Sequence, residues 1–390
     1  MISRNFYQIL LNLSFRTLFG VAWSVVMFLG QSNAQTFLIG GFGDGIYSSS
    51  LGADGQMTEA KLCVKQTRPA FFTFHPKLDV LYAVTESMRN DTAAPAAVTA
   101  YRYARGDQPG TPPKLTLLNS QPIDGDIPCH VSIDAKGEIL VVANYTSGSV
   151  IVLPVSEDGS IQPATSNVQH KGDGTDATQK NPRAHSSVWD PTNRYVLVAD
   201  LGLDKVFVYD VDRPKGLLIL SKNPAMKLAP GSGPRHISIH PNGKWVYVIN
   251  ESNLTMTASM WDAAEGRLTE INTVSTLPDV ASRKGLSTAE VIVHPNGRFV
   301  YGSNRGHDTI ASFRIDDKTG ALTPLGHTSS MGKTPRNFRI SPNGEFLLVE
   351  NQQSDTIYSF RIDQQTGDLK STGFSIKAPA PACIKFVEDK

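Results

Sequence analysis

Hydrophobic and polar positions follow one phrase that returns six times along the chain. Each copy has a short apolar segment, a turn with Pro or a substitute, a Gly, a second apolar segment and a polar tip. The copies are PAFFTFHPKLDVLYAVTE, PCHVSIDAKGEILVVANY, RAHSSVWDPTNRYVLVADL, PRHISIHPNGKWVYVINE, AEVIVHPNGRFVYGSNR and PRNFRISPNGEFLLVENQ. Apolar residues that alternate or run together over a few positions are typical of half-buried and buried β-strands. The pattern therefore predicts one β-hairpin in each copy.

Each hairpin is followed by two further segments of the same kind. A third predicted strand such as IASFRID leads through a turn such as DDKTG into a fourth such as LTPLGHT. Four strands in a unit of about 50 residues is the period of a β-propeller blade. The six copies therefore predict six blades.

The two ends of the array complement each other. The segments FLIGG, GIYSSSL and MTEAKLCV predict three strands at the start, and ACIKFV predicts one strand at the end. Three strands plus one make a seventh blade. We therefore expect an all-β fold over residues 35–390, a seven-bladed β-propeller with four antiparallel strands per blade, closed by N- and C-terminal strands in one blade. An open β-sandwich array, or two all-β domains, would leave this complementarity unexplained.

The first 34 residues differ from the rest. Arg4 and Arg16 precede a mostly apolar stretch, 18–30, which is short for a bilayer span, and Ser32 and Ala34 are the small residues that a signal peptidase inspects. We expect a signal peptide over residues 1–34, cleaved before Gln35, and a periplasmic or secreted protein with no membrane attachment after cleavage. An uncleaved N-terminal anchor is the alternative.

Composition narrows the function further. Lys plus Arg total 37 against 36 Asp plus Glu, without a charged block, so nothing favours a nucleic-acid or membrane-surface partner. Cys63, Cys129 and Cys383 are odd in number and widely spaced, which is no disulfide framework. Because no metal-ligand spacing, phosphate loop or nucleophile elbow is present, we expect neither metal nor cofactor. The oligomeric state stays open.

Aligning the repeats at the turn Pro places two rings of residues at one end face, because the second strand of each hairpin returns antiparallel to the first. The first ring, six residues before the turn, is Ala70, Cys129, His185, Arg235, Ala289 and Arg336; the second, ten residues after it, is Glu86, Tyr145, Leu201, Glu251, Arg305 and Gln352. Chemically different residues at one register indicate a binding site on a repeated scaffold. By contrast, His75, His240 and His294 directly precede the turn on the opposite side, and we assign them no chemistry.

Several phrases resemble a known family, the seven-bladed propeller lactonases, which includes 6-phosphogluconolactonases of the propeller type and carboxymuconate lactonizing enzymes. They are PRAHSSVWD, VADLGLDKVFVYD, GSGPRHISIHPNG, VINE, SNRGHDTIASF and GKTPRNFRISPNG, and the resemblance runs from about Phe37 to Phe386. It implies that the active-site His, Arg, Glu and Arg of the family fall on His185, Arg235, Glu251 and Arg305. The chain departs from the family at Arg183 and Ile292, where a histidine is common, so the preferred substrate is open.

These residue types suit lactone hydrolysis. His185 and Glu251 are candidates to activate water, and Arg235 and Arg305 to stabilise an oxyanion or clamp an anionic group. Each also has a structural alternative, such as Glu251 as an ion-pair strut. Cys129 has no base tied to it by sequence, so a nucleophilic role is not favoured.

Three further residues, Glu86, Arg336 and His307, are weaker candidates for substrate binding near the same face. We therefore predict a metal-independent lactonase that hydrolyses a small anionic sugar lactone, 6-phosphogluconolactonase-like by resemblance. A carboxymuconate-type cycloisomerase and a non-catalytic propeller that binds a ligand or protein are the alternatives.

Overall fold

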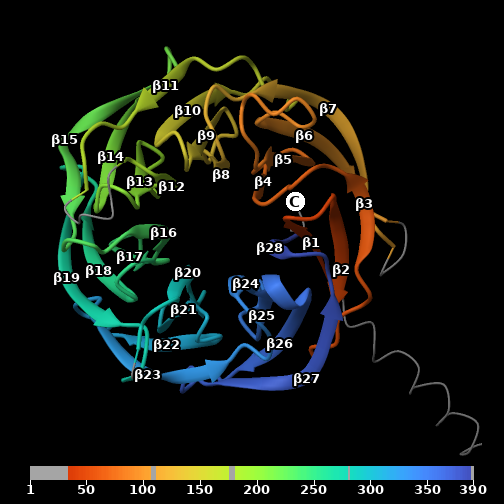
Figure 1. Ribbon diagram of the computed structural model, residues 1–390, viewed down its shortest axis with the longest axis vertical. Helices are drawn as coiled ribbons and strands as arrows, with labels where there is room; N and C mark the ends of the chain where they lie inside the picture. The colour runs from red at the N-terminus through yellow and green to blue at the C-terminus, as the bar shows by residue number, and fades with distance from the viewer. Residues whose placement is uncertain (1–33, 107–110, 175–180, 280–281, 388–390) are drawn as a thin grey trace, which may run out of the picture.

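A computed structural model describes residues 34–106, 111–174, 181–279 and 282–387 of the 390-residue chain. The described residues form seven four-stranded antiparallel sheets arranged in a ring (Figure 1). The predicted all-β, seven-bladed propeller is therefore confirmed.

Each sheet is one blade, and its strands run from the central channel outward in the order given. The first three complete blades are β4 (Phe72–Phe74), β5 (Val80–Thr85), β6 (Ala97–Ala104) and β7 (Lys114–Pro122); β8 (Pro128–Ile133), β9 (Ile139–Asn144), β10 (Ser149–Pro154) and β11 (Ser166–Gln169); and β12 (Ala184–Trp189), β13 (Tyr195–Asp200), β14 (Lys205–Asp212) and β15 (Leu217–Lys227).

The next three blades follow the same order. They are β16 (Pro234–Ile239), β17 (Trp245–Asn250), β18 (Thr255–Asp262) and β19 (Arg267–Ser275); β20 (Ser287–Val293), β21 (Phe299–Arg305), β22 (Thr309–Ile315) and β23 (Leu322–Ser329); and β24 (Pro335–Ile340), β25 (Phe346–Asn351), β26 (Thr356–Ile362) and β27 (Leu369–Lys377), with a 3-10 turn, η1 (Gln352–Ser354), between β25 and β26.

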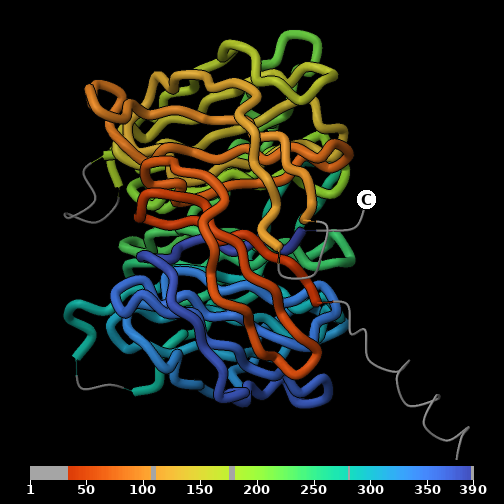
Figure 2. The backbone as a smooth tube through the Cα atoms, turned by 90° about the vertical axis from the view of Figure 1, so that its right-hand side faces the viewer, coloured from red at the N-terminus to blue at the C-terminus, as the bar shows by residue number. Residues whose placement is uncertain are grey.

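The seventh blade joins the two ends of the chain. It consists of β28 (Pro381–Phe386), β1 (Gln35–Gly41), β2 (Gly45–Leu51) and β3 (Lys61–Lys65), in that order from the channel. In the antiparallel pairing of β1 with β28, Ile39 lies opposite Ile384 and Phe37 opposite Phe386. Viewed edge-on, the red N-terminal strands lie between the orange and blue parts of the chain (Figure 2). The predicted closure by both chain ends is confirmed.

Strand burial explains the apolar runs and the alternation in the sequence. The second strand of a blade, such as β5 or β17, is buried along its whole length because neighbouring blades cover both of its faces. The outermost strand, such as β11, alternates between exposed and more buried positions because one face meets solvent. The repeated phrase therefore marks the two inner strands, and the weaker pattern after it marks the two outer ones.

Two repeated side-chain hydrogen bonds tie neighbouring blades together. The Nε2 atoms of His75, His240 and His294 lie 3.1, 2.8 and 2.8 Å from carbonyl oxygens of Gly137, Gly297 and Gly344 in the next blade. In the same three blades, the hydroxyls of Tyr82, Tyr247 and Tyr301 donate to carbonyls of Gly159, Gly320 and Gly367 at 2.9–3.0 Å. These histidines thus have a structural role on the turn side of the ring.

The predicted signal peptide lies almost wholly outside the described residues, which begin at position 34, so it stays a prediction. Across the described ranges, no helix has the length and apolar character needed to cross a membrane.

Deleting β28 should abolish folding. Its buried Ile384 and Phe386 and the ladder to β1 are lost together, and burial of two large apolar side chains alone contributes about 3–6 kcal/mol against a typical total stability of about 5–15 kcal/mol. We expect a chain ending at Ala380 to show no cooperative thermal transition by circular dichroism, whereas a chain ending at Val387 should unfold like the full chain. A cooperative transition in the shorter chain would contradict this role of β28.

A smaller effect is expected for Tyr247→Phe, which removes one buried hydroxyl and leaves the carbonyl of Gly320 without that donor. We expect the free energy of unfolding to fall by about 1–3 kcal/mol, the usual cost of an unsatisfied buried group. Urea denaturation measures this free energy. The control is Tyr358→Phe, which removes a hydroxyl from a half-buried tyrosine of β26. An equal loss in both variants would argue against a specific tie between blades.

Candidate active site

The candidate residues lie at the end face where the innermost strands begin and the second strands end. His185, Arg235 and Arg336 stand at the starts of β12, β16 and β24, while Glu251 directly follows β17 and Arg305 ends β21. Antiparallel pairing of the two inner strands brings these termini to the same face. We call this end of the ring the site face.

The local backbone explains how the inner-strand residues reach the channel. The pairing register shifts between Ala184 and Ser186, between Pro234 and His236, and between Pro335 and Asn337. His185, Arg235 and Arg336 are the residues at these irregularities. A β-bulge takes a residue out of the ladder and redirects its side chain, and bulges are common beside active sites.

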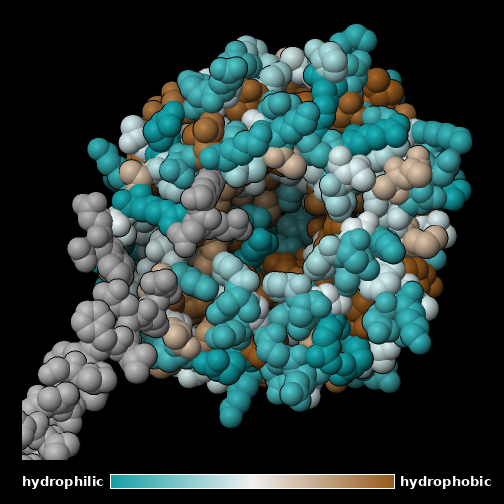
Figure 3. Space-filling view, turned by 180° about the vertical axis from the view of Figure 1, so that it is seen from behind, coloured by the Kyte–Doolittle hydropathy of each residue, from teal (hydrophilic) through white to brown (hydrophobic). Residues whose placement is uncertain are grey.

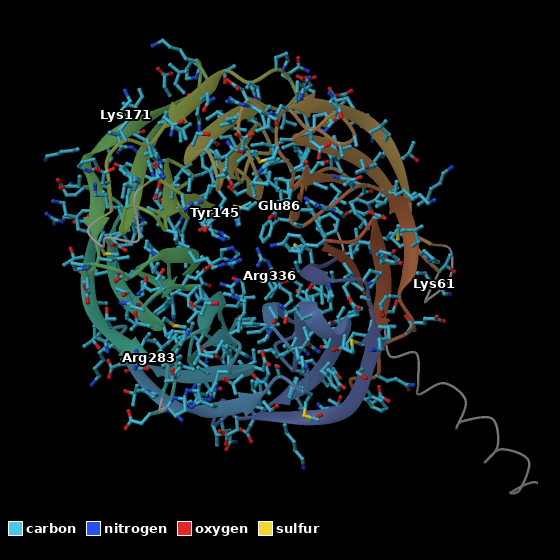
Figure 4. The ribbon with its side chains drawn as sticks, viewed as in Figure 1. Lys61, Glu86, Tyr145, Lys171, Arg283 and Arg336 are labelled. Carbon is cyan, nitrogen blue, oxygen red and sulfur yellow. The ribbon has the colours of Figure 1, made fainter. Side chains whose placement is uncertain are left out.

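A cavity of about 320 Å³ opens on the site face. Its lining is Glu86, Ile127, Cys129, Tyr145, Thr146, His185, Glu251, Arg305 and Arg336. Figure 4 shows Glu86, Tyr145 and Arg336 near the centre of the ring, reaching in from three different blades. Arg235 lies just beneath, in a narrow neck of about 10 Å³ that it shares with His185 and Arg336.

Arg235 and Arg305 hold the same carboxylate oxygen. Oε2 of Glu251 lies 3.0 Å from Nε of Arg235 and 2.9 Å from Nη2 of Arg305. Each arginine also donates to a backbone carbonyl at 2.8 Å, Arg235 to Ala289 and Arg305 to Thr288. The buried Nε–H of Arg305 has no hydrogen-bond acceptor in the described part of the chain, whereas Nε of Arg235 is the atom that contacts Glu251. The pair is therefore fixed in place, and Arg305 retains a donor.

The carboxyl groups of the site respond to this positive charge in different ways. Burial would raise the pKa of Glu251, but the guanidinium groups of Arg305 and Arg235 outweigh burial and lower it. The pKa of Glu86 is raised, because burial outweighs its attraction to Arg336 and Arg235. Burial and the charge of Arg235 lower the pKa of Arg336 to about 10, which still leaves it charged at neutral pH. Positive charge thus exceeds negative charge at the cavity.

His185 is 5 % exposed and packs among aromatic rings. Its ring centroid lies 5.3 Å from that of Tyr145 and 5.2 Å from that of His236, both at steep interplanar angles. Burial, followed by the charge of Arg235 and the neighbouring His236, lowers the pKa of His185 well below its ordinary value. The imidazole is therefore neutral at neutral pH and can accept a proton.

The sequence did not reveal the neighbour of Cys129. Its Sγ lies 3.8 Å from Nδ1 of His185, at a distance that fits a weak sulfur hydrogen bond. Burial and the nearby Glu86 raise the pKa of the Cys129 thiol, so it stays protonated. A protonated thiol is a poor nucleophile. The structure thus supplies a base beside the thiol without making it a thiolate.

A network of three polar side chains lies beneath the site, and the sequence did not predict it. Nδ1 of His236 lies 2.9 Å from Oε1 of Glu290, and Nδ2 of Asn337 donates to Oε2 of Glu290 at 2.6 Å. All three are buried. The only sequence signal was that His236 and Asn337 directly follow Arg235 and Arg336; their common partner on β20 depends on contacts between blades.

His307 is placed differently from the other candidates. Its Nδ1 lies 2.8 Å from Oγ1 of Thr309 and its ring faces His327 at 6.3 Å, and it is absent from the cavity lining. Of the two departures from the family pattern, Arg183 stacks over Tyr145 at 5.0 Å from the ring centroid, whereas Ile292 lines the other half of the channel. Arg183 thus occurs at the edge of the site.

Among the residues that the structure describes, no three His, Cys, Asp or Glu side chains cluster as metal ligands would. The polar groups that the site offers are instead guanidinium groups, carboxyls, imidazoles and a phenol.

Two curated proteins are similar to most of the chain. The 6-phosphogluconolactonase of Bacillus subtilis (strain 168) is 35% identical over 304 residues, which cover 78% of this chain and 82% of the relative. The 6-phosphogluconolactonase of Formosa agariphila is 36% identical over 278 residues, or 70% of this chain and 74% of the relative.

A solved structure described as the periplasmic gluconolactonase of Pseudomonas aeruginosa superposes with a TM-score of 0.84 at 29% identity, covering 91% of this chain and 99% of the other. The sequence profile of the family described as "Lactonase, 7-bladed beta-propeller" matches residues 35–386. With its seven blades, its closure by both chain ends and this match over nearly the whole described chain, the protein belongs to the seven-bladed β-propeller lactonase family.

Proposed function

We propose that the protein is a lactonase that hydrolyses a small anionic sugar lactone at the site face. The observation that carries the proposal is the excess of positive charge in a 320 Å³ cavity, where Arg305 and Arg336 face a carboxylate already shared with Arg235. The names of the relatives, 6-phosphogluconolactonase and gluconolactonase, support lactone hydrolysis.

The arginines supply the fixed positive charge that the reaction requires. A planar guanidinium group donates two parallel hydrogen bonds to a carboxylate or phosphate, and Arg336 and Arg305 line the cavity where such a group would enter. The tetrahedral intermediate carries its negative charge on the former carbonyl oxygen, and preorganised donors stabilise that charge. Arg305 is held by Glu251 and Thr288, so it needs little reorganisation.

His185 is the base in this scheme, and Glu251 positions the arginines. Oε2 of Glu251 is engaged by two guanidinium groups that lower its pKa, which makes the carboxylate a weak base. The neutral imidazole of His185 lines the same cavity. A negative charge bound nearby raises the pKa of an imidazole, so the anionic substrate itself strengthens this base.

The reaction then proceeds in two steps. Water forms a bond from its oxygen to the lactone carbonyl carbon while His185 accepts one water proton. The tetrahedral intermediate collapses, the bond from the carbonyl carbon to the ring oxygen breaks, and the ring oxygen takes the proton from the imidazolium of His185. The product is an open-chain hydroxy acid whose new carboxyl group keeps the second water proton and then releases it to solvent, and His185 returns to its neutral state.

We also propose that the protein is exported. The N-terminal pattern of Arg4, Arg16 and the apolar stretch favours export, and the gluconolactonase of Pseudomonas aeruginosa is described as periplasmic. Phosphorylated sugars are largely confined to the cytoplasm, so an exported enzyme fits an anionic sugar lactone whose charge is a carboxylate.

Replacing the proposed base tests the reaction directly. We expect His185→Gln to lower kcat for lactone hydrolysis about 10²–10⁴-fold with a smaller change in KM, the usual range for loss of general-base catalysis. Acid release from a panel of sugar lactones measures it in a pH-stat. The control is His327→Gln, on the exposed part of β23. Absence of wild-type turnover on every lactone, or equal rates in wild type and His185→Gln, would remove this proposal.

A different result is expected at Glu251. Glu251→Gln keeps the shape but removes the charge that restrains Arg235 and Arg305, so we expect KM to change more than kcat. If kcat instead falls as far as in His185→Gln while KM is unchanged, Glu251 is the base and the assignment of roles is reversed.

The pH dependence follows from the lowered pKa of His185. Because the folded-state pKa lies well below the ordinary value of about 6.5, the neutral form persists as pH falls through that value. We expect kcat/KM to be flat from about pH 8 to pH 6.5 and its acid limb to lie below pH 6.5. The acid limb of kcat should lie at higher pH, because bound substrate raises the pKa of His185. An acid limb of kcat/KM above pH 6.5 that His185→Gln leaves in place would contradict the assignment.

A further inference from the structure

A second cavity lies at the opposite end of the channel, on the face that carries the hairpin turns. Its volume is about 560 Å³, larger than the cavity of the site face. Residues near the ends of five innermost strands line it, including Thr73, Ser238, Arg339 and Lys385. Figure 3 looks onto this turn face and shows a hollow at the centre of the ring.

The charge of this cavity is concentrated at one register. Three residues before the turn Pro or its substitute, the first five complete blades carry uncharged side chains: Thr73, Ser132, Val188, Ser238 and Ile292. At the same level the last complete blade carries Arg339, and the adjacent strand β28 carries Lys385. Two neighbouring blades thus carry a cationic side chain, facing the channel, at a register where the other five blades carry uncharged residues.

These two cations are placed close together without a carboxylate in salt-bridge contact. Across the described ranges, no Asp or Glu oxygen lies within 4.0 Å of the charged nitrogens of Arg339 or Lys385. Nζ of Lys385 lies 5.0 Å from the ring centroid of Phe71. Burial, and then the positive charge of Arg339, lower the pKa of Lys385 to about 8. The two side chains therefore repel each other across the cavity.

Two nearby carboxyl groups do not balance that charge. Glu290 already bonds to His236, Asn337 and the amide of Val291. Glu350 is fully buried, its carboxyl oxygens form no hydrogen bond of ordinary geometry in the described part of the chain, and burial together with Glu290 raises its pKa well above the usual value. Burial therefore disfavours the ionised form of Glu350, and the cavity has a surplus of positive charge.

We propose that the turn-face cavity is a second binding site, which takes a small oxyanion, a carboxylate or a phosphate, between Arg339 and Lys385. Thr73 and Ser238 also line the cavity, and their hydroxyls can donate to the anion. The outer wall contains Phe74, Pro76 and Phe386, which suits an apolar body attached to the charged group. An anion there would relieve the repulsion between the two cations.

This site is separate from the site face. The neck between the two cavities, where Phe71, His236 and Asn337 meet Arg235, has a volume of about 10 Å³, no more than one water occupies. A ligand therefore enters the second site only from the turn face. The inference does not depend on lactone hydrolysis, since it rests on residues that the proposed reaction does not use.

The side chain of Lys385 can report binding by itself. With lysines carrying ¹³C-methyl groups, NMR follows each amine through a pH titration, and the Lys385 signal is the one lost in Lys385→Gln. We expect its pKa to rise from about 8 toward the ordinary value of about 10.4 when inorganic phosphate or benzoate is added, because a bound anion favours the charged amine. The two anions distinguish a bare phosphate site from one that prefers a carboxylate with an apolar body.

Matched variants separate this site from the other. Arg339→Gln should raise the anion concentration that produces half of the pKa shift of Lys385 at least tenfold. Lys244→Gln, which replaces an exposed lysine in a turn, should leave that concentration unchanged. Lactone turnover should be the same in Arg339→Gln, Lys385→Gln and wild type. If neither anion raises the pKa of Lys385, or if Arg339→Gln leaves the effect intact, the second site does not exist. Failure of lactone turnover alone would leave this result untouched.

Discussion

The backbone ladder between β1 and β28 closes the ring, and every other contact of the channel depends on that closure. Each innermost strand is held in place by its two neighbouring blades. Without the pairing of β1 with β28, the seven blades could move apart. His185, Arg235, Arg305 and Arg336 come from β12, β16, β21 and β24, Glu251 follows β17, and no two of them share a strand. Closure therefore sets the distances on which the chemistry of the site relies.

Within this rigid ring, charge is arranged unevenly along the channel axis. At the site face, one ionised carboxylate, Glu251, is shared by Arg235 and Arg305, while the carboxyl of Glu86 has its pKa raised by burial. In the middle, Glu290 is saturated by His236 and Asn337. At the turn face, Arg339 and Lys385 again leave positive charge unbalanced. Both ends thus attract anions, and the narrow neck between them keeps the two ends apart.

Much of this architecture could be predicted from the sequence, because a repeat of four strands fixes both the blade and the register. Counting from the turn Pro was enough to place His185, Arg235, Glu251 and Arg305 at one face. Contacts across blades could not be obtained that way. The approach of Cys129 to His185, and of Glu290 to His236, depends on bulges and on the spacing of neighbouring sheets, which no single strand pattern encodes. His307 shows the converse, since its neighbours in sequence lie at the site face but its side chain bonds to Thr309.

The place of β28 also dictates the order in which the molecule can be completed during its synthesis. β1 leaves the ribosome among the earliest strands, but the strand that covers its inner edge is the last to be made. Until translation ends, the nascent chain carries an unpaired apolar strand edge, which is a template for pairing with another chain. The same seam that makes the finished ring rigid is therefore the point at which two unfinished copies can exchange strands.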